Sequence, residues 1–138
     1  MSKVITAPNA PAALGPYSHA ILAGDTLYSS GQVPLVPETG KLAGESIEEQ
    51  AVQVLKNLEA VLAAADMSFA NVVKTTVFLT DLADFAPMNA IYAEKFPTNP
   101  PPAPACRWQS SPPGRRWRWR SSPFAEGARR FACSRPSP

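Results

Sequence analysis

The sequence changes composition abruptly near Pro100, and this break limits how much of the chain can follow one pattern of folding. Residues 1–100 contain all five lysines, no arginine and ten acidic residues, which gives a net charge of −5. Residues 101–138 contain all eight arginines, one acidic residue, both cysteines, all three tryptophans and half of the sixteen prolines, with a net charge of +7. A chain of this length normally forms one domain. We therefore expect a single domain, residues 1–138, whose regular elements lie mainly before the break.

The first thirty residues have the pattern of a strand followed by a hairpin. Lys3–Pro8 is rich in β-branched residues, which favour a strand. Residues 19–32, HAILAGDTLYSSGQ, contain two β-like runs on either side of Gly24-Asp25, a dipeptide typical of tight hairpin turns.

A helix signal follows. Ser46 with Glu49 three residues later has the pattern of a capping box. Apolar residues then recur at spacings of three and four, which places them on one stripe of a helix: Ile47, Ala51, Val54, Leu55, Leu58, Leu62 and Ala65. We expect this helix to pack one face on a sheet.

Residues 72–79, VVKTTVFL, indicate a central strand with Val73, Thr75, Val77 and Leu79 on one face. Asp84 can cap a second helix that runs to Phe96. Two further strands would complete a ferredoxin-like α+β unit with two helices packed on one face of a mixed sheet. The proline-rich and arginine-rich segment stands where those two strands belong.

Several classes of protein are disfavoured. No apolar run approaches the roughly 20 residues that span a bilayer, and the N-terminal residues lack the pattern of a signal peptide. A cytosolic protein is the simplest interpretation. Cys106 and Cys133 lack the spacing of metal ligands and only His19 could join them, so we expect free thiols and no metal site.

The first hundred residues closely resemble a known family. The stretches NAPAALGPYSHA, LYSSGQVPLVPETGKL and PTNPP, with the long block from Gln50 to Phe96, resemble the RidA/YjgF family of reactive intermediate deaminases over about residues 2–101. The resemblance implies a homotrimer of chorismate-mutase-like subunits with active sites between subunits. It also implies hydrolysis of enamines and imines such as 2-aminoacrylate, 2-iminopropanoate and 2-iminobutanoate to 2-keto acids and ammonia, with no cofactor.

The resemblance also implies which residues form the site. Tyr17 in GPYS matches the family's pocket tyrosine, Ser30 and Gly31 in SSGQ match its strand-end pair, and Asn89 in PMNAIY matches its helix asparagine. We assign Tyr17, Ser30 and Asn89 to catalysis and Gly31 to substrate binding, and Cys106 marks the expected edge of the cleft. Without the resemblance, Tyr17 and Asn89 would more often be structural residues. Ser30 is not a serine-hydrolase nucleophile, because the chain has one histidine and no G-x-S-x-G motif.

The resemblance stops at the compositional break. Family members continue with an arginine that grips the substrate carboxylate and end in two apolar strands, the last of which carries a glutamate. Here Pro104 stands in the place of the arginine, and no acidic residue follows until Glu126. Both charged groups of the family mechanism are therefore missing from residues 102–138.

The genetic code offers an explanation for the break. From Pro101 onward, the third base of each codon can be read together with the first two bases of the next codon. In this shifted frame residues 101–105 permit Ala-Arg-Ala-Cys, and the Ala125/Glu126 junction permits a TGA stop. We hypothesise that one base was lost near the codon for Pro101, so that residues 102–138 are a frameshifted segment in place of the last two strands.

A second interpretation takes the segment as the native sequence. GRRWRWRSS combines charge for phosphates with tryptophans for stacking, so a catalytically inactive scaffold could bind nucleic acid or an anionic membrane, although nucleic-acid binding is disfavoured because the pattern is short. Pro104, Pro112 and Pro113 would not fit central strands, and we then expect poor trimers without deaminase activity. A third interpretation is a translation-inhibiting endoribonuclease, which some members of the family are described to be.

The frameshift hypothesis predicts the mass of the purified protein. We expect an intact mass below that of the 138-residue chain and an Ala-Arg-Ala-Cys peptide in a digest of the region after Phe96. A mass that matches all 138 residues would mean that residues 102–138 are not a translation artefact. The protein itself would then be frameshifted, and the deaminase assignment would describe its ancestry rather than its activity.

Overall fold

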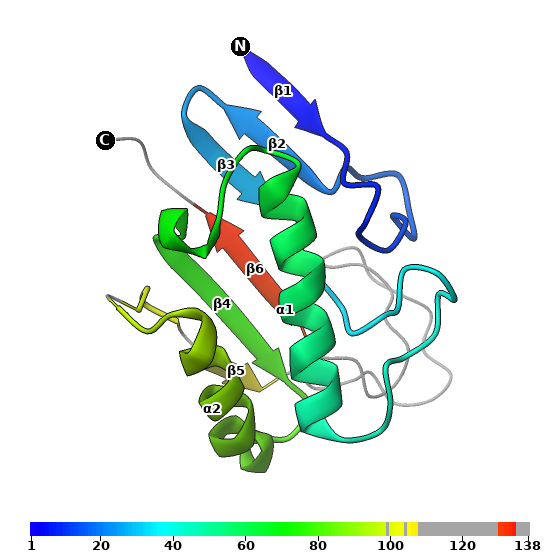
Figure 1. The fold of residues 1–138 in the computed structure, drawn as a ribbon, viewed down its shortest axis with the longest axis vertical. Coiled ribbons are helices and arrows are strands. Elements are labelled where there is room, and N and C mark those ends of the chain that lie inside the picture. Colours follow the sequence, from blue (N-terminus) through cyan, green and yellow to red (C-terminus); the bar gives the residue numbers. More distant parts are fainter. Residues whose placement is uncertain (99, 104, 108–129, 135–138) are drawn as a thin grey trace.

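The computed structural model describes residues 1–138 except 99, 104, 108–129 and 135–138 (Figure 1). The strands are β1 (Ser2–Ile5), β2 (Ala20–Ala23), β3 (Thr26–Ser29), β4 (Lys74–Leu79), β5 (Ala105–Arg107) and β6 (Arg130–Ser134). The helices are α1 (Ile47–Ala63) and α2 (Phe85–Lys95), with short 3-10 turns η1 (Phe69–Asn71) and η2 (Leu82–Asp84).

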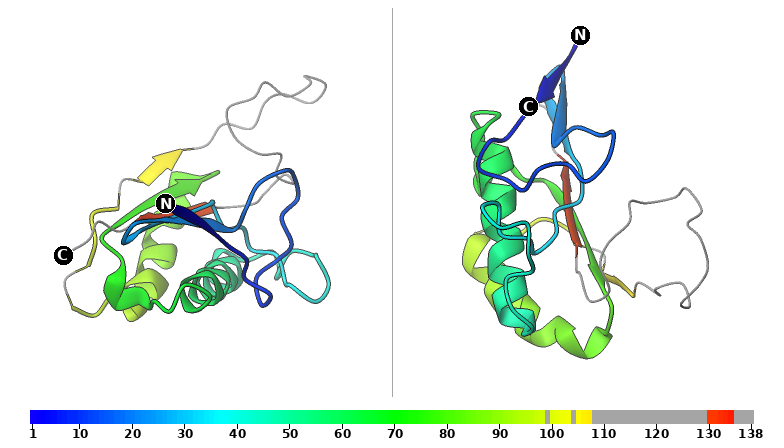
Figure 2. Two further views of the ribbon diagram at one scale, coloured as in Figure 1. Left: turned by 90° about the horizontal axis from the view of Figure 1, so that it is seen from above. Right: turned by 90° about the vertical axis from the view of Figure 1, so that its right-hand side faces the viewer.

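The strands form one mixed sheet in the order β1-β2-β3-β6-β4-β5. All neighbouring pairs are antiparallel except β4 and β5, which are parallel. Both helices cover the same face of this sheet, as the two side views make clear (Figure 2). The predicted α+β class, with two helices on one face of a mixed sheet, is confirmed.

Strands β5 and β6 lie in the segment that was expected to stand in place of the last two strands. β5 extends the sheet beside β4, and β6 lies between β3 and β4, facing five residues of β4 from Lys74 to Phe78. Strand pairing uses main-chain N–H and C=O groups, so an altered side-chain sequence does not by itself prevent it. The prolines expected to break strands, Pro104, Pro112 and Pro113, lie outside the described residues.

The N-terminal half of the sheet follows its sequence pattern. β2 and β3 form the predicted hairpin, and Gly24 in its turn has φ +59°, a left-handed conformation that favours glycine. Ile5, Ala20 and Leu27 are buried on the helical side. This hairpin leads directly to the loops in which the candidate site lies.

The predicted capping box of α1 is confirmed. Ser46 Oγ accepts a hydrogen bond from the Glu49 N–H at 3.2 Å, and Glu49 Oε2 accepts one from the Ser46 N–H at 3.4 Å. Gly44 precedes this cap with φ +105°, and a side chain there would collide with the Glu49 carboxylate. The cap therefore fixes both where the helix begins and how the chain approaches it.

The core lies between α1, α2 and the sheet. The apolar stripe of α1 is buried from Ile47 to Leu62, as predicted, and meets Val77 and Leu79 of β4 and Met88 of α2. The predicted alternation of β4 is confirmed for Thr75, Val77 and Leu79, whereas Val73 precedes the strand and is 37% exposed.

Helix α2 is tied to the sheet by a buried polar contact. Thr75 Oγ1 and Tyr92 Oη are 2.7 Å apart, and both residues are buried. The prediction that the Asp84 side chain caps α2 is wrong. Asp84 already has helical dihedrals and makes no capping hydrogen bond, because η2 leads straight into the helix, and it is Asp81 that accepts from the Ala83 N–H at 2.9 Å.

Two valines of α1 provide a matched test of the core. Val54 is fully buried and Val52 is 41% exposed on the same helix. We expect Val54→Ala to lower the free energy of unfolding by about 2 kcal/mol, because two methyl groups leave the core and a cavity remains. Val52→Ala serves as the control, with a change within about 0.5 kcal/mol. Equal losses in urea unfolding of the two variants would contradict this packing.

Candidate functional site

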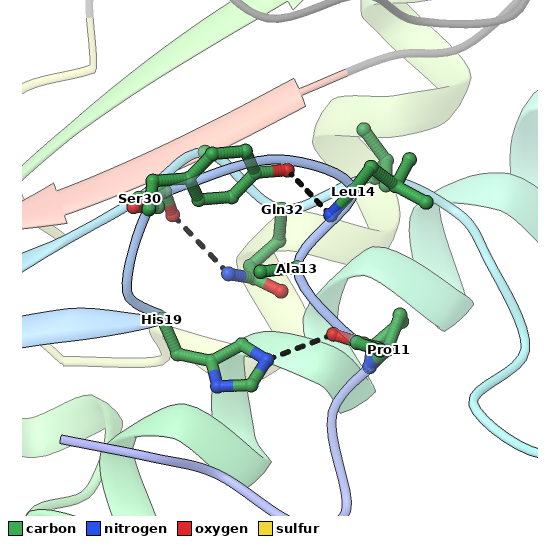
Figure 3. A pocket seen from close by; sticks show the side chains of 10 residues that line it. Pro11, Ala13, Leu14, His19, Ser30 and Gln32 are labelled. Atoms are coloured by element: carbon green, nitrogen blue, oxygen red, sulfur yellow. Dashed lines mark hydrogen bonds between the residues drawn. The ribbon is translucent and has the colours of Figure 1, made fainter.

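A small pocket lies where the loop before β2 crosses the chain that leaves β3 (Figure 3). One wall comes from residues 11–19 and the other from residues 30–33. The lining residues are Pro11, Ala12, Ala13, Leu14, Tyr17, His19, Ser30, Gly31, Gln32 and Val33. None of these lining side chains is an acid, a lysine or an arginine, so the pocket combines apolar surface with uncharged hydrogen-bonding groups.

Tyr17 is held in a folded-back conformation. Its N–H donates to Gly15 O at 2.8 Å, and its phenolic oxygen accepts from the Leu14 N–H at 3.2 Å. A Cβ at Gly15 would lie 3.2 Å from the Tyr17 ring, so the ring packs closely against the glycine. Because the phenolic oxygen acts as acceptor in this contact, its own hydrogen is available to a ligand. The side chain is 38% exposed.

Ser30 follows the end of β3 and is anchored to the loop before β2. Its hydroxyl donates to Ser18 O at 2.7 Å, and its N–H donates to His19 O at 2.9 Å. With its proton engaged by a carbonyl, the hydroxyl presents only lone pairs to the pocket. Among the described residues no base contacts this hydroxyl, since the His19 ring is bonded elsewhere, which agrees with the prediction that Ser30 is not a hydrolase nucleophile.

His19 braces the loop that forms the first wall. Its Nε2 lies 2.8 Å from Pro11 O, and its Nδ1 accepts from the Ala7 N–H at 3.2 Å. These contacts fit the tautomer that carries its hydrogen on Nε2, because a backbone carbonyl accepts and a backbone N–H donates. His19 is therefore a structural part of the pocket.

Gln32 is a pocket residue that the sequence interpretation missed. Its side chain is 5% exposed, and Nε2 donates to Ser30 O at 3.2 Å. The contact is with the backbone two residues earlier, so it joins two residues of the second wall. The position directly after Ser30 and Gly31 was the only signal that could have identified it.

The second wall is fixed from behind by helix α1. Asn57 is buried, and its Nδ2 donates to Val33 O at 2.8 Å and to Leu35 O at 2.9 Å. Gln53 Nε2 in turn donates to Asn57 Oδ1 at 2.9 Å. Polar residues at 50, 53 and 57 follow helical spacing beside the apolar stripe, and this pattern could have revealed the contact.

The structure brings together three of the five predicted site residues. Tyr17, Ser30 and Gly31 line the pocket, whereas Asn89 and Cys106 do not. Asn89 is exposed on α2, and its side chain has no hydrogen bond to another described residue. Cys106 lies in β5, which is three strand spacings, about 14 Å, from β3. A site that contains all five residues would need a second copy of the chain.

Comparison with known proteins identifies the family of this chain. The family model described as Endoribonuclease L-PSP matches residues 7–108. The chain belongs to this family, and its RidA/YjgF resemblance is confirmed. The end of the match near residue 108 lies just after the compositional break, so the L-PSP sequence pattern covers the part that forms α1, α2 and the pocket.

Two sequence relatives are named for deamination. Reactive Intermediate Deaminase A, chloroplastic, of Arabidopsis thaliana is 50% identical over 103 residues, which are 75% of this chain and 54% of that protein. The chain thus spans about half the length of that relative. Human 2-iminobutanoate/2-iminopropanoate deaminase is 46% identical over 99 residues, 72% of each chain.

Solved structures of the family share the whole arrangement. The crystal structure of RidA from Psychrobacter sp. has a TM-score of 0.81 at 34% identity and covers 96% of this chain and 98% of its own. A Rid family protein from Yersinia pestis has a TM-score of 0.84 at 36% identity and covers 99% of this chain and 100% of its own.

The contact of Asn57 with the pocket wall predicts a large effect of a small substitution. We expect Asn57→Asp to lower the free energy of unfolding at pH 7 by about 3 kcal/mol or more, because the Val33 and Leu35 carbonyls lose their donor and face a buried carboxylate. Thermal or urea unfolding measures the loss. Asn71→Asp is the control, since the exposed Asn71 Oδ1 only accepts from the Ser68 N–H and a carboxylate can do the same. Similar losses in both variants would contradict the assignment.

Proposed function

We propose that the chain hydrolyses small enamine and imine intermediates, such as 2-aminoacrylate, 2-iminopropanoate and 2-iminobutanoate, to 2-keto acids and ammonia. The observation that carries the proposal is the convergence of Tyr17, Ser30 and Gly31 on one pocket at the end of β3. The names of relatives at 46–50% identity support the same chemistry. The reaction consumes one water and needs no resident cofactor.

The pocket chemistry suits this reaction. Water must add to C2 of the C=N bond, and the nitrogen must gain protons before it leaves as ammonia. The Tyr17 hydroxyl can donate a hydrogen bond toward the nitrogen, while Ser30 offers lone pairs that can hold the water. The apolar wall formed by Ala12, Ala13 and Val33 suits a short aliphatic side chain.

Binding of the substrate carboxylate is the part that the described pocket does not provide. The resemblance implies an arginine at the position of Pro104, which lies outside the described residues. A bidentate arginine is the strongest carboxylate partner available to a protein, so Pro104 should weaken substrate binding rather than alter the chemistry. Because β5 and β6 are paired with β4, we expect the full 138-residue chain to be a slow deaminase rather than the inactive protein expected from the sequence.

A homotrimer completes the proposal. On the sheet face opposite the helices, Val4 and Tyr28 are 58% and 56% exposed, and they flank Ile21 in register across β1, β2 and β3. Packing of this face between copies would remove that apolar surface from water. A second copy could also bring Asn89 and Cys106 to the pocket. A cytosolic location fits the proposal, and none of the described helices has the length and hydropathy that a bilayer span requires.

The alternatives receive less support. The basic and aromatic stretch that could bind nucleic acid or membrane lies outside the described residues. An endoribonuclease name is attached to the family, but cleavage by paired histidines would need a second histidine. The single His19 has both ring nitrogens hydrogen-bonded to the backbone.

Activity of tyrosine variants tests the proposal. An amino-acid oxidase can generate 2-iminobutanoate in place, and the release of ammonia and 2-oxobutanoate can then be followed. We expect Tyr17→Phe to lower kcat/KM about a hundredfold, as removal of a general acid typically does. Tyr28→Phe is the matched control and should retain the activity, because Tyr28 lies outside the pocket and the substitution keeps the ring whose apolar surface the proposed trimer would bury.

The position of the missing arginine supplies a second comparison. Pro104→Arg should raise kcat/KM at least about tenfold, the effect of one good charge-assisted contact. Absence of imine hydrolysis in both the full chain and Pro104→Arg would contradict the proposed function.

A further inference from the structure

The amide of Gln32 is the only buried side-chain amide among the described lining residues of the pocket. Gln32 is 5% exposed and Nε2 donates to Ser30 O at 3.2 Å. No described residue donates to Oε1. Figure 3 shows the nitrogen of this amide directed toward Ser30 and its oxygen turned away from that residue.

A buried amide oxygen without a donor is costly. Burial of an unpaired polar atom opposes folding by an amount comparable to a lost hydrogen bond, so such atoms in proteins normally meet water or a ligand. The amide is oriented by its nitrogen, because a rotation that exchanged its two ends would place an oxygen against the Ser30 carbonyl. Oε1 is therefore held as an acceptor within the pocket.

The hydroxyl groups of Tyr17 and Ser30 are less restricted in their hydrogen bonding than this amide oxygen. The Tyr17 hydroxyl has its hydrogen available, and the Ser30 hydroxyl gives its hydrogen to Ser18 O. Gln32 Oε1 differs from both in having no hydrogen and no rotational freedom, since Nε2 is anchored. It can bind a ligand N–H or O–H but not a ligand carbonyl oxygen.

We propose that Gln32 Oε1 accepts the N–H at C2 of the substrate and so distinguishes the imine from the 2-keto acid product. This inference rests on the proposed function. An imine or enamine presents an N–H donor at C2, whereas the product presents a carbonyl oxygen there. An acceptor facing that carbonyl repels it, so the same atom favours substrate binding and product release. Gln32 thus determines specificity, and the hydrolysis itself does not require it to transfer a proton.

Binding to the unmodified full chain tests the inference without turnover. The probes are 2-aminobutanoate, which has an N–H donor at C2, and 2-oxobutanoate, which has an acceptor there; both have the same chain length and carboxylate. We expect the amine to bind about tenfold more tightly in calorimetry, the value of one hydrogen bond that the other ligand lacks. Equal affinities, tighter binding of the keto acid, or no binding of either ligand would overturn the inference.

Variants identify the atom responsible. Gln32→Met has a similar length and no acceptor, so it should abolish the difference in affinity and lower kcat/KM for 2-iminobutanoate about tenfold. Product inhibition by 2-oxobutanoate should stay equal or become stronger, which a merely structural loss would not produce. Gln50→Met is the control: Gln50 is also buried, but it bonds Gly44 O away from the pocket, and the variant should keep the discrimination.

The two proposals can fail separately. If the full chain and Pro104→Arg hydrolyse no imine but the amine still binds more tightly, the deaminase function fails and the role of Gln32 in recognising N–H groups stands. If imines are hydrolysed and Gln32→Met keeps both the affinity difference and kcat/KM, the role of Gln32 fails and the function stands.

Discussion

The packing of α1 on both halves of the sheet is the contact on which the rest of the structure depends. Among the described residues, β3 and β6 share one facing pair, Tyr28 and Ser134, whereas β4 and β6 share five. Backbone pairing alone therefore joins the β1-β2-β3 half only weakly to the β6-β4-β5 half. The stripe of α1 lies in one apolar cluster with residues of both halves, Ile5 and Leu27 on one side and Val77 and Leu79 on the other.

Helix α1 also makes the pocket rigid. Its two walls are loops, and loops seldom hold functional groups in place without support from regular elements. Asn57 of α1 fixes the wall at Val33, and His19 fixes the wall at Pro11. The Ser30 N–H and hydroxyl, bonded to His19 O and Ser18 O, then join the walls. Each link is a backbone carbonyl satisfied by a specific donor, so the pocket shape depends on directional bonds as well as on packing.

The sequence was informative wherever a residue acts through its neighbours along the chain. The Ser46 capping box, the α1 stripe and the Gly24 turn depend on spacings of a few residues, and all three are present. Asn57 and His19 were missed as pocket residues because their important partners are distant along the chain: Asn57 reaches a carbonyl 24 residues away and His19 an amide 12 residues away. Gln32 was missed because only its position after Ser30 and Gly31 indicated it. Asp84 was misjudged because η2, which removes the need for its cap, has no distinctive pattern.

The strands after the compositional break show the limit of reading a fold from side chains. β6 occupies the centre of the sheet, yet its sequence RFACS gave no strand signal amid arginine and proline. Main-chain geometry and a vacant edge of β4 suffice for pairing, because each strand residue offers one donor and one acceptor whatever its side chain. Binding of a carboxylate tolerates fewer sequence changes than strand pairing does, since a carboxylate needs a cation of defined geometry. These strands thus preserve the family fold, while under the proposed function Pro104 would remove the contact that holds the substrate carboxylate. Membership of the family and catalytic strength are therefore separate properties of this chain.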